Sequence, residues 1–335
     1  MITGPILLTG AGGDIGIALA RVLRETWPKV VLVGADCDPY AVGAEFFDHF
    51  HTLPRADDPS YIVALRMLVR EERARVLMPL AEAELARLFA EGLIGEEFGE
   101  AALVTANRRA LAVGLDKLAT ARTLAAAGIS VPETGIVGED EPGDFDIVVK
   151  PRRGQGSKGL RMLARSDYDA IESKCESNLW QRWLKDEGEE YTCGIARFEG
   201  MPIWSLSFRR RLSGGLTGSG EVVHDIRLAS ICAAVAEALE LDGAINIQLR
   251  MDAGRPTIFE INPRFSSTAG FRHRLGFRDA IWSIEDRLGL AVGRYDPPPA
   301  GMRIARVSQE VIRAPVAAAA SRAEASLAWS RLSTG

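Results

Sequence analysis

Short apolar runs alternate with helical patterns in the N-terminal part of the chain. Residues 5–9, 29–34 and 74–79 are apolar runs of strand length, and residues 61–72 have apolar positions at the spacing of an amphipathic helix. Strands separated by helices are typical of a parallel sheet with right-handed crossovers. We therefore expect a parallel α/β unit over residues 1–105.

The composition excludes several other classes of protein. The chain has 335 residues, of which 47% are apolar and 25% charged, as in ordinary globular proteins. The net charge of −5 disfavours non-specific binding to nucleic acid, which needs a large positive field. No apolar run approaches the roughly 18 residues of a membrane span, and the cysteines are few and far apart. We expect a cytoplasmic protein with no nucleic-acid and no membrane partner.

Beyond residue 105 the sequence predicts helices mixed with paired strands. The expected elements are a helix over 107–127, a strand over 146–151, paired strands over 190–198 and 202–209, a helix over 226–241, a hairpin of 244–251 with 255–261, and a last strand over 302–312. Residues 315–335 are rich in Ala and Ser and predict either a surface helix or a frayed tail.

Two polar side chains share one face of the second hairpin strand. Glu260 and Asn262 are two residues apart, so a strand points both the same way. Their oxygens suit a hard cation such as Mg²⁺, and Gln248 on the preceding strand would face Glu260 as a third oxygen ligand. Only one of the three is a carboxylate, so the phosphates of a nucleotide would have to complete the site. The alternative is a polar edge strand without a ligand.

A glycine-bearing loop follows the strand that ends near Lys150. Gly154, Gly156 and Gly159 allow backbone N–H groups to approach phosphate oxygens closely, and Lys150 can touch the same anion. The loop is not a Walker loop, because no GK[ST] sequence opens a helix. It predicts either a phosphate-binding loop or a flexible hairpin turn.

A second glycine-rich turn lies at residues 9–16, between the first strand and the first helix. Asp36 follows the second strand, about 20 residues on, where a dinucleotide-binding fold binds ribose hydroxyls. This pattern favours an NAD(P)-dependent reductase. No Tyr-x-x-x-Lys pair occurs downstream, however, and this interpretation leaves the later motifs without a purpose.

The order of the later motifs resembles the ATP-grasp superfamily. The motifs are Lys117, the strand end 149–151 with its glycine loop, the segment 181–191, Gln248, and the run Glu260-Ile261-Asn262-Pro263-Arg264. Gln248 and the Asn-Pro-Arg ending make the chain most similar to the carbamoyl-phosphate-synthase-like branch. The resemblance spans residues 5 to about 312.

The resemblance implies a fold class of α/β and α+β. A doubly wound parallel α/β domain is followed by an ATP-grasp fold of two α+β lobes. The implied boundaries are 1–105 for the N-terminal Rossmann-like domain, 106–184 for a small lid lobe with a linker helix, 185–314 for a large lobe with the magnesium site, and 315–335 for the tail.

The resemblance also implies a role for each matching residue. Lys117 and Lys150 would hold the phosphates of ATP, with Lys150 and Arg264 taking part in catalysis and Arg264 contacting the acyl phosphate. The remaining ATP-binding residues would be Gly154, Gln155, Gly156, Ser157 and Gly159 in the lid, Gln181, Arg182, Trp183 and Leu184 in the hinge that reads adenine, and Glu190 or Glu187 at the ribose. Gln248, Glu260 and Asn262 would bind Mg²⁺, with Mn²⁺ as a substitute.

Arginines near the implied substrate position form a further group of candidates. Arg209 and Arg211 lie in a run of three arginines that suits the carboxylates of a substrate, although a solvated strand with outward charges explains the run equally well. Arg272 lies near where relatives close over substrate, and we expect it to contact the substrate.

The function implied by the resemblance is ATP-dependent ligation of a small amino-acid-like carboxylate to an amine or a thiol. The carboxylate would attack the γ-phosphate of ATP, and the acyl phosphate would then react with the acceptor. The partners would be these small molecules, with a homodimer among the assemblies common in such folds. The alternatives are the NAD(P)-dependent reductase and a non-catalytic ATP-binding sensor, for which Cys193, at a position often acidic in relatives, leaves room.

Overall fold

The computed structural model describes residues 2–312 except 97, 155–158, 172–176 and 186–189. Two compact units divide the described residues. The first unit contains residues 2–81, 98–103 and 307–312, and the second contains residues 82–96 and 104–306. The predicted domain boundaries at 105, 184 and 314 stay predictions.

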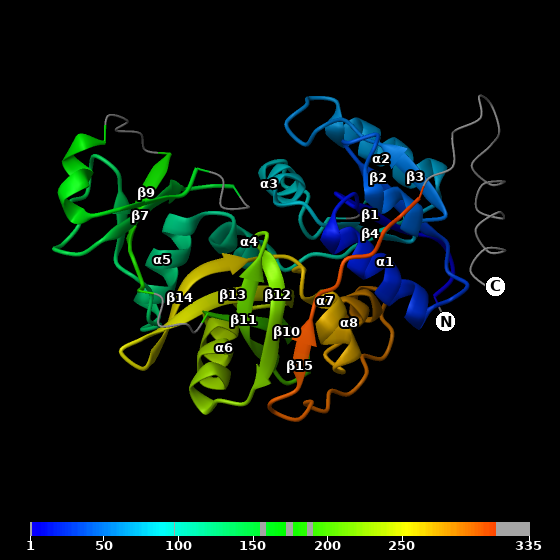
Figure 1. The fold of residues 1–335 in the computed structure, drawn as a ribbon. Helices are drawn as coiled ribbons and strands as arrows, with labels where there is room; N and C mark the ends of the chain where they lie inside the picture. The colour runs from blue at the N-terminus through cyan, green and yellow to red at the C-terminus, as the bar shows by residue number, and fades with distance from the viewer. Residues whose placement is uncertain (1, 97, 155–158, 172–176, 186–189, 313–335) are drawn as a thin grey trace. The chain divides into compact units, whose positions relative to one another are not determined.

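The first unit contains a five-stranded parallel sheet with the strand order β3-β2-β1-β4-β5. Figure 1 labels β1 to β4. Because β1 lies between β2 and β4, the strand order reverses there, which confirms the expected doubly wound topology. The strands are β1 (Ile6–Thr9), β2 (Leu32–Asp36), β3 (His49–Thr52), β4 (Val76–Pro79) and β5 (Ala102–Leu103), and the helices are α1 (Asp14–Thr26), η1 (Val42–Phe46) and α2 (Tyr61–Glu71).

The glycine-rich turn between β1 and α1 is tightly packed and is hydrogen-bonded to residues of the same unit. A Cβ atom on Gly16 would lie 2.2 Å from the carbonyl oxygen of Ala11, so only glycine fits there. The Gly12 N–H donates to Asp36 Oδ2 at 2.8 Å, and the Asp38 N–H donates to Asp36 Oδ1 at 3.0 Å. Both oxygens of the acid expected at a ribose therefore already accept backbone hydrogen bonds.

The second unit begins with three helices, α3 (Glu82–Ala90), α4 (Arg108–Gly114) and α5 (Lys117–Ala126). The single helix expected over 107–127 is wrong, because Asp116 caps a new helix in the middle of it. Asp116 has an extended backbone, and its Oδ1 accepts from the N–H groups of Leu118 and Ala119 at 3.0 and 3.1 Å. The break makes Lys117 the first residue of α5.

A four-stranded antiparallel sheet follows, in the order β6-β9-β7-β8. Its strands are β6 (Thr134–Ile136), β7 (Ile147–Pro151), β8 (Arg161–Leu163) and β9 (Asn178–Arg182), with η2 (Arg165–Ala170) after β8. Ile147, Val149 and Trp180 are buried together on one face of this sheet. β7 confirms the strand predicted over 146–151 and ends beside the glycine loop.

The main sheet of the second unit has six antiparallel strands in the order β14-β13-β10-β11-β12-β15. The elements are β10 (Glu190–Arg197), β11 (Trp204–Ser213), β12 (Leu216–Val223), α6 (Ile226–Ala238), β13 (Gly243–Asp252), β14 (Arg255–Asn262), α7 (Ala269–Arg274), α8 (Asp279–Arg287) and β15 (Arg303–Ala305). Both predicted strand pairs are confirmed. The last strand is shorter than expected, and β12 was not predicted from the sequence.

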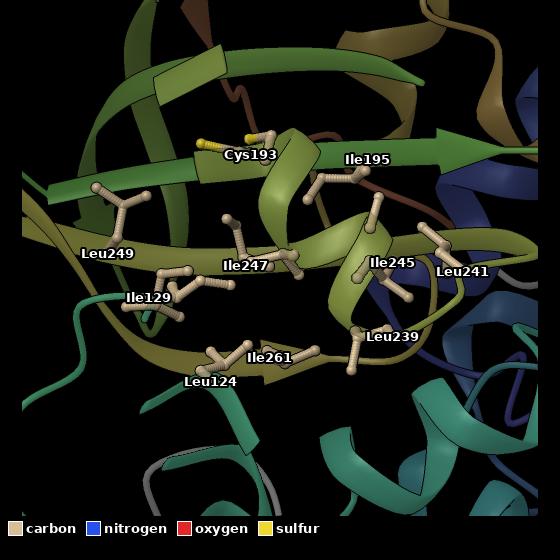
Figure 2. Close-up of a cluster of buried hydrophobic side chains, with 14 of the residues drawn as sticks. Leu124, Ile129, Cys193, Ile195, Leu239, Leu241, Ile245, Ile247, Leu249 and Ile261 are labelled. Atoms are coloured by element: carbon tan, nitrogen blue, oxygen red, sulfur yellow. The ribbon is translucent and has the colours of Figure 1, made fainter. Parts of the chain in front are cut away.

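The two faces of the six-stranded sheet differ in what they carry. On the first, here named the α6 face, Cys193, Ile195, Ile247 and Leu249 pack in one apolar cluster with residues of α6 (Figure 2). The opposite face, here named the site face, carries the alternate residues of the same strands, among them Gln248. None of the helices in the described part of the chain is long and apolar enough to cross a bilayer.

Candidate active site on the six-stranded sheet

The predicted metal ligands come together on the site face. The register of β13 and β14 pairs Gln248 with Glu260, as the hairpin pattern predicts, and it also pairs Asn246 with Asn262. The Asn262 amide is 7% exposed, and its Nδ2 has no hydrogen-bond partner among the described residues. A buried amide without a hydrogen-bond partner costs folding free energy. A bound ligand that accepts a hydrogen bond from Asn262 Nδ2 would remove this cost.

Lys150 extends from β7 toward this hairpin. Its Nζ donates to Gln181 Oε1 at 2.8 Å and to the carbonyl oxygen of Phe259 at 3.3 Å. Burial lowers the pKa of Lys150 from its usual 10.5 to about 8; the charge of Lys117 lowers it too, while that of Glu260 raises it. A buried ammonium next to a second cation favours a bound anion.

Lys117 stands at the N-terminus of α5, next to the glycine loop. Its Nζ donates to the carbonyl oxygen of Gly154 at 2.6 Å. Asp116 anchors this corner, because Arg152 donates to both its carboxylate oxygens, at 2.9 and 2.8 Å. Although Asp116 is buried, these bonds and the helix amides keep its pKa below the usual value. Lys117 is thereby held at the start of the loop predicted to bind phosphate.

Glu82, at the start of α3, is a site residue that the sequence did not reveal. Burial raises its pKa, while Lys117 and Arg264 lower it and Glu260 raises it further. Burial lowers the pKa of Arg264, and Glu82 and Glu260 oppose that shift. These side chains thus form one electrostatic cluster. Glu82 belongs to none of the motifs, and a single acid in a helical pattern gives no signal of a site.

The predicted hinge residues lie on β9 and just beyond it. The N–H of Arg182 donates to Glu133 O, and that of Trp183 donates to Asp146 O, each at 2.8 Å. The Leu184 carbonyl accepts from Arg250 at 2.9 Å. Two backbone N–H groups of the segment expected to bind adenine are therefore already hydrogen-bonded within the second unit.

Glu190 lies between two arginines on the site face. Its Oε1 accepts from Arg210 Nη2 at 2.6 Å, and its Oε2 accepts from Arg250 Nη2 at 2.9 Å. All three residues stand in one row of cross-strand partners on β11, β10 and β13. The carboxylate expected at a ribose is thus engaged in a buried ion triad, so its contribution to nucleotide binding would require that triad to rearrange.

Arg272 does not lie where a substrate contact was expected. It is 1% exposed, and its Nη2 donates to Asp279 Oδ2 at 2.6 Å. Its Nη1 donates to Asn246, Ser266 and Thr268 at 2.9–3.1 Å. Burial raises the pKa of Asp279 despite the adjoining guanidinium. The pair fixes α7 to α8 and holds the Arg272 guanidinium in the interior. The expected contact between Arg272 and a substrate stays a prediction.

Arg209 and Arg211 lie on the face of the six-stranded sheet opposite to the predicted metal ligands. β11 alternates, so these two side chains point to the α6 face while Arg210 between them points to the site face. Arg209 forms an ion pair with Glu221 on β12. The structure therefore does not bring these arginines to Glu260, and it agrees with the alternative of a solvated strand.

Several predicted ATP-binding residues fall outside the described part of the chain. These are Gln155, Gly156 and Ser157 of the glycine loop and Glu187 before β10. Gly154 and Gly159 are described and both have a positive φ, +109° and +75°, which favours glycine at each position.

The residues on the site face suit Mg²⁺ only together with an anionic ligand. Gln248, Glu260 and Asn262 offer hard oxygen atoms, but only one is charged, and no group of three His, Cys, Asp or Glu suited to a metal occurs among the described residues. Lys150 and Arg264 each interact electrostatically with Glu260, and Lys117 interacts with Lys150 and with Glu82. A polyphosphate would offset this positive charge and supply the missing ligands.

Two family models match parts of the chain. Residues 181–310 match a family described as ATP-grasp in the biosynthetic pathway with Ter operon, and residues 6–102 match the PylC-like N-terminal domain. Residues 181–310 thus match an ATP-grasp family. The placement of the chain in the carbamoyl-phosphate-synthase-like branch stays a prediction, since neither matched description names that branch. No curated protein matches the chain.

Solved ATP-grasp structures show a similar fold. N5-carboxyaminoimidazole synthetase from Staphylococcus aureus, complexed with ADP, is 16% identical, with 87% of this chain and 79% of that chain covered and a TM-score of 0.68. N5-carboxyaminoimidazole ribonucleotide synthetase from Thermotoga maritima is 18% identical, with 88% of this chain and 78% of that chain covered and a TM-score of 0.65. Biotin carboxylase from Campylobacter jejuni is 14% identical (87% and 72%, TM-score 0.67). At these identities the likeness shows the fold alone.

Proposed function

We propose that this ATP-grasp chain is an ATP-dependent ligase that joins a small carboxylate to an amine or a thiol through an acyl phosphate. A C–N bond is the product to test first. The observation that carries the proposal is the cluster of Lys117, Lys150 and Arg264 with the carboxylates of Glu82 and Glu260. Three cations against two carboxylates, on a chain of net charge −5, leave a local excess of positive charge that favours a polyphosphate ligand.

In this proposal the cations make the approach of two anions feasible. A carboxylate must attack the γ-phosphorus of ATP, so negative charge accumulates as the bond forms. Lys117 and Lys150 hold the phosphates, and Arg264 stabilises the charge on the acyl phosphate and its oxyanion. Each charge-assisted hydrogen bond contributes roughly 1.5–3 kcal/mol, so several acting together lower the barrier by orders of magnitude.

Glu82 acts as a positioning residue. Its carboxyl group lies close enough to Lys117 and Arg264 to influence the pKa of Arg264 and to be influenced by both. Holding two long cationic side chains near one point lowers the entropy that binding the phosphates would otherwise cost.

Gln248, Glu260 and Asn262 would hold Mg²⁺ together with phosphate oxygens, and Mn²⁺ would be a substitute. When bound, the metal supplies further positive charge to the triphosphate. Gly154 and Gly159 would cover the phosphates at the two ends of the loop, and Gln181 to Leu184 would contact adenine through the backbone groups that remain available. Glu190 stays a candidate for the ribose, with Glu187 as the second candidate.

The names of the relatives support this proposal. The S. aureus synthetase was complexed with ADP, and a 2-oxoglutarate carboxylase domain of similar fold was complexed with MgADP and bicarbonate. The matched family is described within a biosynthetic pathway, which favours an enzyme over a sensor. The proposal gives no role to three predicted substrate contacts. Arg209 and Arg211 point to the α6 face, and Arg272 is buried in an ion pair with Asp279.

The test is release of ADP and phosphate in a panel of amino acids and hydroxy acids, each supplied with amine acceptors. The wild-type chain should release ADP with at least one acid, and Glu260→Gln should lower the rate by about a hundredfold or more. Exposed Arg255 on β14 provides a matched control, and Arg255→Gln should turn over normally. Normal ADP release by Glu260→Gln would refute the metal assignment.

Two other results would support the alternatives. Tight ATP binding without turnover on any acid would favour the sensor. A higher melting temperature with NAD(P)H than with ATP and Mg²⁺ would favour the reductase, although Asp36 already binds the backbone of its own turn.

A further inference from the structure

A concave surface lies on the α6 face, away from the candidate active site. Its volume is 650 Å³, within the range of about 300–1,000 Å³ that small-molecule sites occupy. α6 packs against β10, β11 and β14, whereas this surface lies toward the other edge of the sheet, on β11, β12 and β15. The lining residues are Arg209, Arg210, Arg211, Ser219, Gly220, Glu221, Arg303, Ile304 and Ala305.

The side chains on this surface form two rows across three strands. In the first row Arg209 pairs with Glu221, and Glu221 pairs with Arg303. In the second row Arg211 pairs with Ser219, and Ser219 pairs with Ala305. Cross-strand partners point to the same face of a sheet, so the surface gathers the side chains of three arginines.

The charge of this surface is strongly positive. Three guanidinium groups stand against one carboxylate, that of Glu221, which is bound to Arg209. Arg211 faces a hydroxyl group and not an acid across the strand pair, and both Arg211 and Arg303 are exposed. The chain as a whole has a net charge of −5, so this concentration of positive charge is local.

The spacing of the arginines suits more than one anionic group. Residues two apart on a strand lie about 6.6 Å apart, and strands that are two positions apart in a sheet lie roughly 10 Å apart. Arg209, Arg211 and Arg303 therefore surround an area that a single phosphate or carboxylate would not span. A guanidinium group binds such oxyanions through paired N–H donors.

We propose that this surface is a second ligand site, which binds a small polyanion carrying two or more phosphate or carboxylate groups. It is separate from the ATP site proposed above. Arg210, which follows Arg209 directly, points through the sheet to the site face and binds Glu190. The sheet itself therefore lies between the two sites.

The test is isothermal titration calorimetry with inorganic pyrophosphate and with citrate, in EDTA so that no divalent metal is bound. The two probes distinguish a phosphate ligand from a carboxylate ligand. At least one should bind the wild-type chain, and the double variant Arg211→Gln/Arg303→Gln should bind it about tenfold or more weakly, a loss of about 1.4 kcal/mol. Higher salt should weaken binding as well.

Two further variants separate this site from the ATP site. Lys117→Met/Lys150→Met should retain the pyrophosphate or citrate binding that the arginine variant loses. Arg255→Gln, which changes an exposed arginine on the opposite edge strand, should bind as the wild type does. Matching unfolding midpoints would show that the arginine variant is folded.

The proposal fails if neither probe binds at millimolar concentration, or if the arginine variant binds as tightly as the wild type. It also fails if the lysine variant alone abolishes binding, because the probe would then occupy the ATP site. None of these results bears on ADP release, so the proposed ligase activity stands or falls separately.

Discussion

Arginines on the two faces of the six-stranded sheet are used in opposite ways. On the site face, Arg210 and Arg272 are buried and each is bonded to a carboxylate at 2.6 Å. On the α6 face, Arg209, Arg211 and Arg303 are exposed around a concave surface. A buried guanidinium needs its partner, because an unpaired charge is costly away from water. The exposed guanidinium groups are solvated, and Arg209 among them is paired with Glu221.

Removal of Arg272 should have the largest effect. Arg272→Ala leaves Asp279 buried without its cation, and loss of one partner of such a pair costs about 3–5 kcal/mol. The free energy of unfolding from urea titration measures this loss. Arg272→Met/Asp279→Leu removes both charges and should recover part of it. A loss below 1 kcal/mol for the single variant would show that the pair does not stabilise the fold.

Weakening the triad around Glu190 should cost less. Glu190→Gln keeps the size of the side chain but removes the charge shared by Arg210 and Arg250, and hydrogen bonds to charged groups contribute about 1.5–3 kcal/mol each. We expect a loss of about that size in urea unfolding. An unchanged stability would mean that solvent satisfies both arginines, although Arg210 is buried.

Lys150 should make stability depend on pH. Its pKa is about 8 in the folded chain against the usual 10.5, so between these values the unfolded chain binds the extra proton. The stability of the wild type should therefore rise with pH over that window relative to Lys150→Met, by at most about 1.4 kcal/mol per pH unit. Parallel curves for the two proteins would show that Lys150 keeps an ordinary pKa.

Changes on the α6 face should have the smallest effect on stability. Arg209→Gln breaks an exposed ion pair with Glu221, and exposed pairs contribute only about 0–1 kcal/mol. The same urea titration should place this variant within that range. A loss equal to that of Arg272→Ala would remove the distinction between the two faces.

The sequence predicted the parts of the fold whose patterns are local. Alternation gave the hairpin of β13 and β14 and put Gln248 opposite Glu260. The break at Asp116 was hidden, because Lys117 to Ala126 continues the preceding helical pattern and only the cap and Arg152 mark a new start. The motif order indicated Lys117 and Lys150 as site residues.

The rest depended on register and tertiary contacts. Arg209 and Arg211 were placed near a substrate by their position in the chain, but the register of β11 turns them to the other face. Arg272 was predicted from chain position as well, and its buried partner Asp279 comes from the next helix. Glu82 enters the cluster from α3, far from every motif in sequence.

The most direct test of the central claim is a crystal structure grown with ADP and Mg²⁺. The account predicts nucleotide density on the site face, with phosphate oxygens within hydrogen-bond distance of Lys117 and Lys150 and the metal on Glu260. Nucleotide density at the glycine turn of residues 9–16, with the site face empty, would contradict it.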